Sequence, residues 1–175
     1  MKLKTTILIL LTISSIKLCA QTEKEHMNFV IQPQVLIPTS EIKETNGISF
    51  GGYISYENPL AEKLRLLISY GGGLFQGKKF VLNSVYEDTY PAIAFMQLRP
   101  GIKYFVTEKH LWVSALIGIG YSFKKGETSL GFSYAPSLGY AISKKFDIAV
   151  RYDATSYKNY SANGVGFNLG YHLGN

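Results

Sequence analysis

The residues best suited to acid–base or metal chemistry are three histidines, His26, His110 and His172. No two of them have the close spacing of a zinc motif, and no serine has an evident partner histidine that would activate it as a nucleophile. The single cysteine, Cys19, lies within the first 20 residues, and removal of those residues would leave no thiol nucleophile, disulfide or thiolate metal site. The sequence therefore predicts a protein that is not an enzyme and holds no cofactor or metal.

A second group with chemical potential is a set of six charges in stretches where apolar residues alternate with small or polar ones. These charges are Arg65, Arg99, Lys103, Asp147, Arg151 and Asp153. All six fall on the face opposite the apolar one, so we expect them to point into a common interior. Unpaired charges in a narrow interior are costly, which predicts ion pairs of Asp147 or Asp153 with Arg99 or Arg151. The expected role is a plug that fixes the shape of the protein; the alternative is an ion path or gate.

The first 20 residues have the layout of a cleaved secretory signal peptide. Lys2 and Lys4 precede an apolar run from Ile7 to Ile16, and Leu18-Cys19-Ala20 ends in a small residue. The run is shorter than the roughly 20 residues of a spanning helix, which disfavours a membrane anchor. Leu18 disfavours a lipoprotein acylated at Cys19. Cleavage would remove three lysines and no acid, lowering the net charge from +6 to +3 and leaving 21–175 as one domain.

Strict alternation of apolar residues with polar or small ones predicts eight β-strands of about ten residues each. The expected strands are 29–37, 48–56, 64–74, 92–104, 111–123, 130–142, 146–154 and 165–173. Strands of this length cross a bilayer when tilted. Tight turns alternate with loops, of which the longest is 76–89 and others are 124–129 and 157–163. The pattern predicts an all-β fold, an eight-stranded antiparallel up-and-down transmembrane β-barrel with both chain ends on the periplasmic side.

A soluble, periplasmic, lipocalin-like ligand-binding barrel is the alternative with the same number of strands. Such a barrel carries large apolar residues inside and charges outside. Here the face opposite the apolar one is rich in small residues such as Gly118 and Ser122, which cannot fill an apolar core at normal density. This favours the membrane barrel. Three prolines fall within expected strands, where each removes a ladder hydrogen bond and is expected at a bulge: Pro33, Pro100 and Pro136.

Several short segments resemble the porin-family outer membrane β-barrel domain, which includes small OmpA/OmpX-like barrels. They are Gln32-Pro33-Gln34-Val35, Gly51-Gly52-Tyr53, and the segments 101–108, 134–140 and 165–171. The resemblance covers essentially the whole mature chain and implies a location in the bacterial outer membrane. It also implies a non-enzymatic role in structure, surface interaction or envelope integrity. A narrow channel for ions or very small solutes is the alternative function.

The partners that this setting implies are outer-membrane lipid, lipopolysaccharide and the barrel-insertion machinery, with no nucleic acid and with the protein as a monomer. Lysines on the expected outer loops are either solvated or in contact with lipopolysaccharide phosphates: Lys78, Lys79, Lys124, Lys125 and Lys158. Some barrels of similar size act on lipid A acyl chains and need a serine and a histidine on the outer side. All three histidines here fall on the periplasmic side, which argues against such an enzyme.

Overall fold

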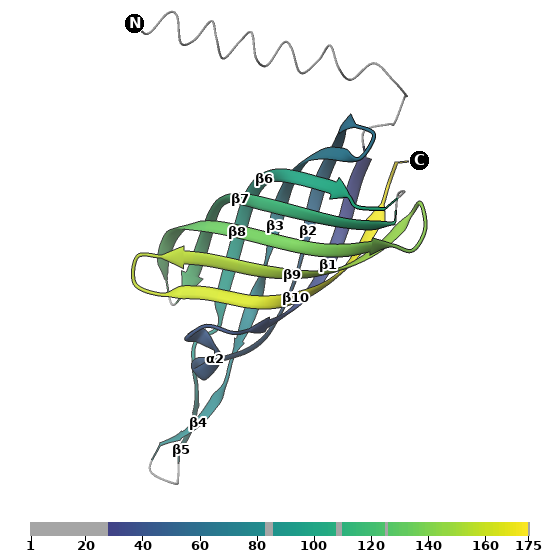
Figure 1. The fold of residues 1–175 in the computed structure, drawn as a ribbon. Helices are drawn as coiled ribbons and strands as arrows, with labels where there is room; N and C mark the ends of the chain where they lie inside the picture. Colours follow the sequence, from purple (N-terminus) through teal and green to yellow (C-terminus); the bar gives the residue numbers. More distant parts are fainter. Residues whose placement is uncertain (1–27, 83–85, 108–109, 125, 175) are drawn as a thin grey trace, which may run out of the picture.

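Eight long strands form one closed antiparallel barrel in the computed structural model, which describes residues 28–82, 86–107, 110–124 and 126–174 (Figure 1). In chain order they are β1 (Asn28–Pro38), β2 (Asn46–Ala61), β3 (Leu64–Gly77), β6 (Ile93–Phe105), β7 (Leu111–Lys124), β8 (Glu127–Ala141), β9 (Phe146–Tyr157) and β10 (Ser161–His172). Each strand pairs with the next of these eight, and β10 pairs with β1. The predicted eight-stranded, antiparallel, up-and-down β-barrel is confirmed. The expected signal peptide, 1–20, lies outside the described residues.

The strands alternate between buried and exposed side chains in the phases that the sequence predicts. In β1, Val30, Gln32 and Leu36 are buried, whereas Phe29 and Ile31 are exposed. The β1–β2 register is unbroken over nine residue pairs, so inward residues of one strand lie beside inward residues of the next. A slip of one residue would turn every inward side chain outward, and the contrast between the two faces therefore fixes the register.

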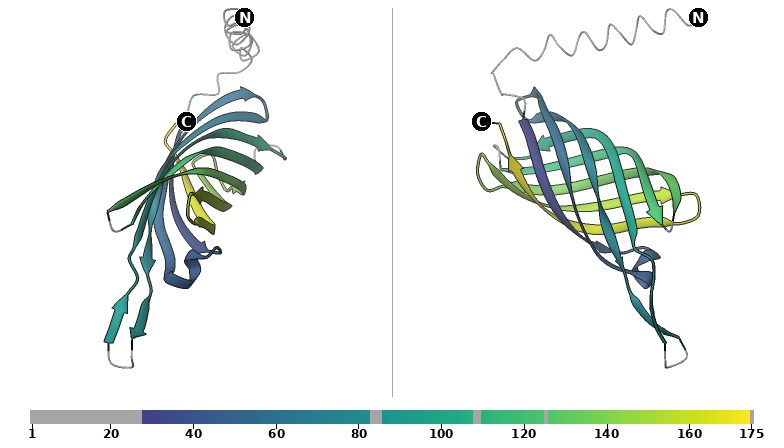
Figure 2. Two further views of the ribbon diagram at one scale, coloured as in Figure 1. Left: turned by 90° about the vertical axis from the view of Figure 1, so that its left-hand side faces the viewer. Right: turned by 180° about the vertical axis from the view of Figure 1, so that it is seen from behind.

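The end of the barrel away from the chain termini carries two additional elements (Figures 1 and 2). A short helix, α2 (Ile42–Thr45), lies in the β1–β2 connection. The long connection between β3 and β6 forms a hairpin of β4 (Lys79–Leu82) and β5 (Tyr86–Thr89), which projects from the barrel as an extension of its strands. We call this end the outer end and the opposite one the periplasmic end, following the predicted orientation.

Two of the predicted outer loops, 124–129 and 157–163, are wrong in length. Strand β7 continues to Lys124 and β8 begins at Glu127, and only three residues separate β9 from β10. The additional strand residues are mostly polar, for example Thr128, Ser129 and Thr155. Apolar alternation marks only the part of a strand that contacts apolar surroundings, so a pattern based on it ends before the hydrogen-bonded ladder does.

The three prolines expected within strands, Pro33, Pro100 and Pro136, do not lie at bulges, which corrects the expectation from the sequence. Each pairs with a residue of one neighbouring strand, as Pro33–Gly52, Pro100–Ile68 and Pro136–Ala115. On the other side, the ladder lacks pairs at the proline but keeps its register, because Ile31 pairs with Tyr171 and Gln34 with Asn168. In an antiparallel ladder, a residue directs its N–H to one neighbour only. A proline within a strand therefore removes pairing with one neighbouring strand and leaves pairing with the other neighbouring strand intact.

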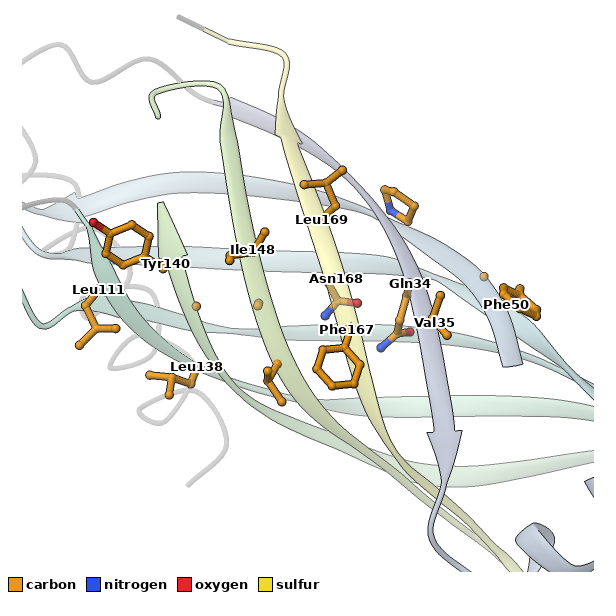
Figure 3. Close-up of a pocket in the computed structure, with 15 residues that line it drawn as sticks. Gln34, Val35, Phe50, Leu111, Leu138, Tyr140, Ile148, Phe167, Asn168 and Leu169 are labelled. Atoms are coloured by element: carbon orange, nitrogen blue, oxygen red, sulfur yellow. The ribbon is translucent and has the colours of Figure 1, made fainter. Parts of the chain in front are cut away.

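The outer surface of the barrel is apolar and almost free of charge. Its outward side chains include Phe50, Ile54, Ile117, Phe132 and Leu138, each more than half exposed. In the described parts of the eight strands, exposed charged side chains occur only at the outer ends, on Lys124 and Glu127. A hollow of about 820 Å³ crosses this surface over β2, β1, β10, β9, β8 and the first residue of β7 (Figure 3). No helix in the described residues is long and apolar enough to cross a membrane.

Candidate functional site

The lumen of the barrel is filled by three layers of buried side chains. The outer layer is apolar and consists of Leu36, Ile42, Phe75, Ile93 and Phe95. The middle layer is centred on Tyr53, Arg99, Arg151 and Asp153. The periplasmic layer contains Asn28, Glu57, Arg65, Lys103, Asp147 and His172.

The outer layer closes the lumen beneath α2. Ile42 of the helix packs into the cluster at 5 % exposure, and Phe75 and Phe95 stack in a tilted geometry with ring centroids 5.2 Å apart. Tyr160 and Ala162, from the β9–β10 end, cover the cluster as partly buried neighbours. The five residues of this layer are all apolar, so this mouth of the barrel is packed without a charged side chain in the layer.

In the middle layer, Asp153 receives hydrogen bonds on both carboxylate oxygens. Arg99, which is fully buried, pairs with Oδ1 through Nη1. Gln34 Nε2 donates to Oδ2 at 2.5 Å. A charged group that is buried this deeply is stable only when its lone pairs are used, and here two strands on different sides of the barrel supply the donors.

Tyr53 lies between two guanidinium groups in the same layer. Its ring centroid is 4.9 Å from the Cζ atoms of both Arg99 and Arg151. Its hydroxyl donates to Gln97 Oε1 at 2.5 Å, and Gln97 Nε2 donates to Thr155 Oγ1 at 2.8 Å. The electron-rich faces of the ring favour the two cations and keep the like charges apart. The Tyr53 ring therefore offsets part of the excess positive charge of two arginines beside one carboxylate, Asp153.

Arg151 uses neutral acceptors in place of a carboxylate. Its Nη2 donates to Gln32 Oε1 at 3.0 Å and its Nε donates to Ser137 Oγ at 3.4 Å. Within the described residues, no carboxylate oxygen lies within 4.0 Å of its guanidinium nitrogens, so the predicted Arg151–Asp153 pair does not form as a direct contact. Arg99 forms the direct ion pair with Asp153 instead.

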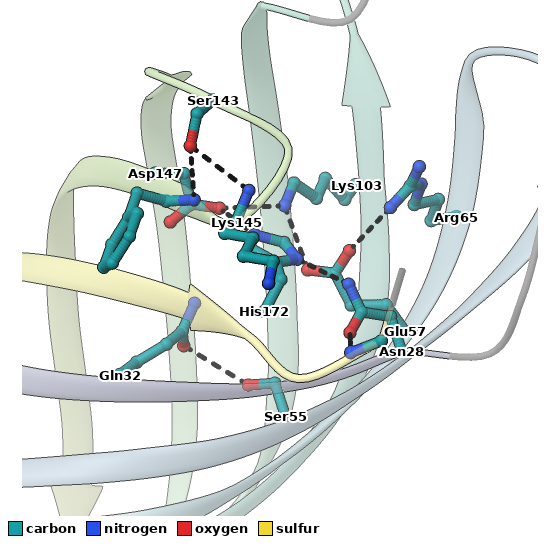
Figure 4. A network of polar contacts seen from close by, with 12 residues as sticks. Asn28, Gln32, Ser55, Glu57, Arg65, Lys103, Ser143, Lys145, Asp147 and His172 are labelled. Atoms are coloured by element: carbon teal, nitrogen blue, oxygen red, sulfur yellow. Dashed lines mark hydrogen bonds and ion pairs between the residues drawn. The ribbon is translucent and has the colours of Figure 1, made fainter.

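In the periplasmic layer, Lys103 bridges two acids (Figure 4). Its Nζ lies 2.9 Å from Glu57 Oε1 and 3.3 Å from Asp147 Oδ2. The same ammonium lies 4.3 Å from the Trp112 ring centroid. Arg65 binds the other oxygen of Glu57 at 3.2 Å. Two acids therefore meet two cations, and the layer is neutral before the charge of any histidine is counted.

His172 connects this layer to the seam where the first and last strands meet. Its Nε2 lies 2.9 Å from Asp147 Oδ2, and its Nδ1 lies 2.6 Å from Asn28 Nδ2. Asn28 Oδ1 also accepts the backbone N–H of Gly174 at 2.8 Å. Across the whole layer, each of the strands β1, β2, β3, β6, β9 and β10 contributes one side chain. The network thus joins six of the eight strands.

Glycine residues on the lumen face make room for these long side chains. A Cβ at Gly170 would lie 2.0 Å from Asp147 Oδ1, and one at Gly166 would lie 2.2 Å from Gln34 Nε2. At Gly139, a Cβ would lie 2.1 Å from the Trp112 ring. In a barrel of eight strands the interior is only wide enough for side chains to fill it, so a large residue on one strand requires a small one opposite.

The structure places all six predicted charges in the lumen, divided between two layers. Arg99, Arg151 and Asp153 lie in the middle layer, and Arg65, Lys103 and Asp147 lie in the periplasmic layer. Glu57, His172 and Tyr53 complete the network and were missing from the predicted set. Glu57 has the inward phase of β2, but its position just beyond the expected strand 48–56 hid it. The apolar outer layer was not predicted, because the lumen face of the strands was expected to carry small and polar residues.

The candidate catalytic groups do not come together. His110 is exposed and stacks on Tyr140 with centroids 5.7 Å apart, while His172 is engaged in the periplasmic layer. The segment 47–51 has the spacing Gly-x-Ser-x-Gly of a nucleophile elbow, but it lies within β2 and not at a strand-to-helix turn. Its Ser49 is buried at 1 % exposure. In the described chain, no group of three or more His, Cys, Asp or Glu residues is arranged to hold a metal ion.

Comparison with known proteins relates the chain to others by structure alone. No protein-family model matches it, and no curated protein matches its sequence. The crystal structure of Ail, the attachment invasion locus protein of Yersinia pestis, is similar with a TM-score of 0.62 and 13% identity, over 85% of this chain and 99% of Ail. The outer membrane protein OprG from Pseudomonas aeruginosa is similar with a TM-score of 0.52 and 11% identity, over 85% and 97% of the two chains.

Neisserial surface protein A is also similar, with a TM-score of 0.50 and 15% identity over 83% of this chain and 94% of that protein. At these identities the likeness concerns the fold and not the function. The closed ring of eight antiparallel strands, the apolar exterior and the polar lumen all agree with it. The chain therefore has the fold of the small eight-stranded transmembrane barrels of outer membranes.

Proposed function

We propose that this chain is an exported, non-enzymatic outer-membrane protein whose filled barrel acts as a rigid scaffold at the cell surface. The observation that carries the proposal is the lumen, which is occupied by the three layers from the outer to the periplasmic end. A barrel that cannot pass solutes contributes to the envelope through its rigidity and through the elements it displays. The element best placed for display is the β4–β5 hairpin.

Three features support the outer-membrane location. The leader 1–20 has the layout of a signal peptide, the barrel exterior is apolar, and the similar solved structures include proteins described as outer membrane proteins. A soluble lipocalin-like barrel does not fit, because it would place these apolar residues inside. A single closed barrel leaves no unpaired strand edge within the bilayer, which agrees with a monomer inserted by the barrel-insertion machinery.

The outer end offers contacts for lipopolysaccharide. Lys78 and Lys79 lie at the base of the β4–β5 hairpin, and Lys124 and Lys158 lie at the outer turns, while Lys125 of the predicted set lies outside the described residues. Lys79 is partly neutralised by Glu87, which lies 3.4 Å away and is also exposed to solvent. Lysine side chains near a membrane surface attract anionic head groups. We include outer-leaflet lipopolysaccharide among the partners on this ground.

Two measurements test the scaffold proposal. Fractionated envelopes should contain the protein in the outer membrane, and the purified barrel should show no sustained conductance in planar bilayers. Closure should depend on the outer layer, so a variant carrying both Phe75→Ala and Phe95→Ala should conduct more than the parent. Large, stable single-channel currents from the parent would refute the scaffold proposal.

A narrow channel is the second candidate, and one observation favours it. Below the apolar outer layer, the buried polar and charged side chains of the middle and periplasmic layers follow one another along the lumen, beside two small apolar clusters, Leu67 with Leu116 and Ala135, and Phe105 with Trp112 and Ala149. In such a channel, the outer layer would act as the gate. Small ion-selective currents that increase in the Phe75→Ala, Phe95→Ala variant and are abolished by Arg99→Gln would favour this candidate over the scaffold.

A further inference from the structure

The hollow on the outside of the barrel runs from Phe50, in the outer half of β2, to Leu111, at the periplasmic end of β7 (Figure 3). One row of its lining residues crosses neighbouring strands through the pairs Phe50–Val35, Val35–Phe167 and Phe167–Val150. A second row ends at the rim through the pairs Ile148–Tyr140 and Tyr140–Leu111. The hollow is therefore a groove about two residues wide along the strands.

The lining of the groove suits hydrocarbon. The side chains that project into it are aliphatic or aromatic, and the polar inward residues that also line it, Gln34 and Asn168, are at most 4 % exposed. Its volume of about 820 Å³ falls within the usual range for pockets that hold small molecules. The ring of Tyr140 lies at the rim, where amphipathic aromatic residues meet the polar head-group region.

Cations flank the rim end of this groove. The β8–β9 turn follows directly after Tyr140 and Ala141 and contains Lys144 and Lys145, both exposed, and no acid. His110 stacks on the Tyr140 ring from the neighbouring turn. An apolar groove that ends beneath a basic turn has the complementarity of one amphiphile with a hydrocarbon chain and an anionic head.

Hydrogen bonds brace the backbone of the basic turn. Ser143 Oγ accepts the backbone N–H groups of Lys145 and Phe146 at 3.2 and 3.1 Å (Figure 4). Ile142 N donates to Phe146 O at 2.9 Å, and Lys145 O accepts the backbone N–H of His172 at 2.9 Å. The two lysine backbones are therefore fixed relative to the groove before any ligand arrives, which lowers the entropic cost of binding.

We propose that this groove is a binding site for one anionic phospholipid of the periplasmic leaflet. One acyl chain lies along Val150, Ile148 and Leu138, and the phosphate meets Lys144 and Lys145. A second copy of the barrel fits less well, because two copies in the same orientation would bring their basic turns together. Lipopolysaccharide also fits less well, because its leaflet lies at the other end of the barrel. The proposal rests on the membrane setting but not on the closed lumen.

The test measures which lipid stays with the barrel. The protein is reconstituted in vesicles of equal parts phosphatidylglycerol and phosphatidylcholine, extracted into a mild detergent, and weighed intact by mass spectrometry. We expect one phosphatidylglycerol to be retained in preference to phosphatidylcholine. Equal retention of the two lipids, or retention of neither, would overturn the proposal.

Variants then separate the two halves of the site. Lys144→Glu with Lys145→Glu should lower phosphatidylglycerol retention at least about tenfold, since each lysine near a membrane surface contributes roughly a fivefold attraction. Val150→Trp should reduce retention of both lipids by filling the groove. Lys124→Glu with Lys158→Glu, the matched change at the outer end, should have no effect. An unchanged preference in the Lys144, Lys145 variant, or its loss in the outer-end control, would contradict the assignment.

A salt titration keeps the test independent of folding in the variants. The parent should lose its preference for phosphatidylglycerol in molar salt, which screens exposed charges, and should keep some bound lipid of either kind. A preference that survives molar salt would overturn the role of the two lysines. Lipid retention and bilayer conductance are separate measurements. Failure of the lipid proposal can therefore be distinguished from failure of the scaffold proposal.

Discussion

The two ends of the lumen are packed with side chains of opposite chemistry. The outer layer consists of carbon packed against carbon, with Phe75 at 1 % exposure against Phe95. The periplasmic layer consists of ion pairs, with Lys103 held between Glu57 and Asp147. Apolar packing needs only the correct volume, whereas an ion network needs every partner. We therefore expect the outer layer to tolerate exchange of one apolar residue for another and the periplasmic layer to tolerate very little.

The largest expected effect is that of Lys103→Met. The change leaves Glu57 and Asp147 buried with Arg65 as the one lysine or arginine left in the periplasmic layer, so unfolding in urea should require about 3–5 kcal/mol less free energy. The double variant Lys103→Met, Glu57→Gln should recover part of that loss because it removes one of the stranded acids. If the single variant is as stable as the parent, the lower lumen is wet and the contrast between the two layers disappears.

The next effect concerns the outer layer. Phe75→Ala should cost about 3 kcal/mol through the cavity it creates, and Phe75→Leu should cost less than about 1.5 kcal/mol. Both losses, measured by urea unfolding, should be the same at low and high salt because no charge is involved. Phe50→Ala is the matched control, since Phe50 lies on the adjacent outer surface and is 55 % exposed. If Phe50→Ala lowers the free energy of unfolding as much as Phe75→Ala does, packing in the outer layer contributes no more to stability than the lipid-facing surface does.

Gly170→Ala should perturb the periplasmic layer without changing its charge. The new methyl group would lie 2.0 Å from Asp147 Oδ1 and would displace this carboxylate from Lys103 and His172. We expect a loss of roughly 2 kcal/mol in the free energy of unfolding, as for other overpacked sites. Gly47→Ala is the control, because its nearest neighbouring atom is 3.8 Å from the new Cβ. Equal stability of the two variants would show that the network can rearrange.

Arg65→Gln should have the smallest effect among these changes. Its side chain is 21 % exposed, and Glu57 retains Lys103 when Arg65 is replaced. Partly solvated ion pairs contribute little, so the expected loss is below about 1 kcal/mol and should shrink further in high salt. A loss comparable to that of Lys103→Met would mean that the layer acts as one cooperative unit.

The strands and the direction of their side chains could be predicted because contact with lipid imposes the same alternation along every strand. Every second residue must be apolar, so Ile117 and Leu138 identify their outward faces without any knowledge of the interior. The same rule assigns Arg99 and Asp153 to the lumen. Their pairing could not be predicted, because any inward acid can reach several inward cations in a barrel this narrow.

The features missed by the sequence lie where the lipid rule ends. Thr128 and Thr155 extend their strands beyond the apolar band, so nothing in their pattern distinguishes strand from loop. Glu57 lies one residue past an expected strand end. Phe75 also lies one residue past an expected strand end, and Phe95 is a large residue on a face expected to hold small and polar ones, so only the three-dimensional arrangement shows that they meet. The position of the phospholipid groove depends on the shape of the barrel, which alternation does not encode.

The hydrogen bond between Asn28 and His172 also has a consequence for the timing of assembly. It joins residues separated by 144 positions, near the two ends of the described chain. The hairpins between neighbouring strands can form locally, but this contact must wait until the final strand has arrived. Long-range contacts of this kind are slow to form because they require closure of a large loop. We therefore expect Asn28→Ala to delay the last kinetic phase of refolding into vesicles while leaving the earlier phases unchanged.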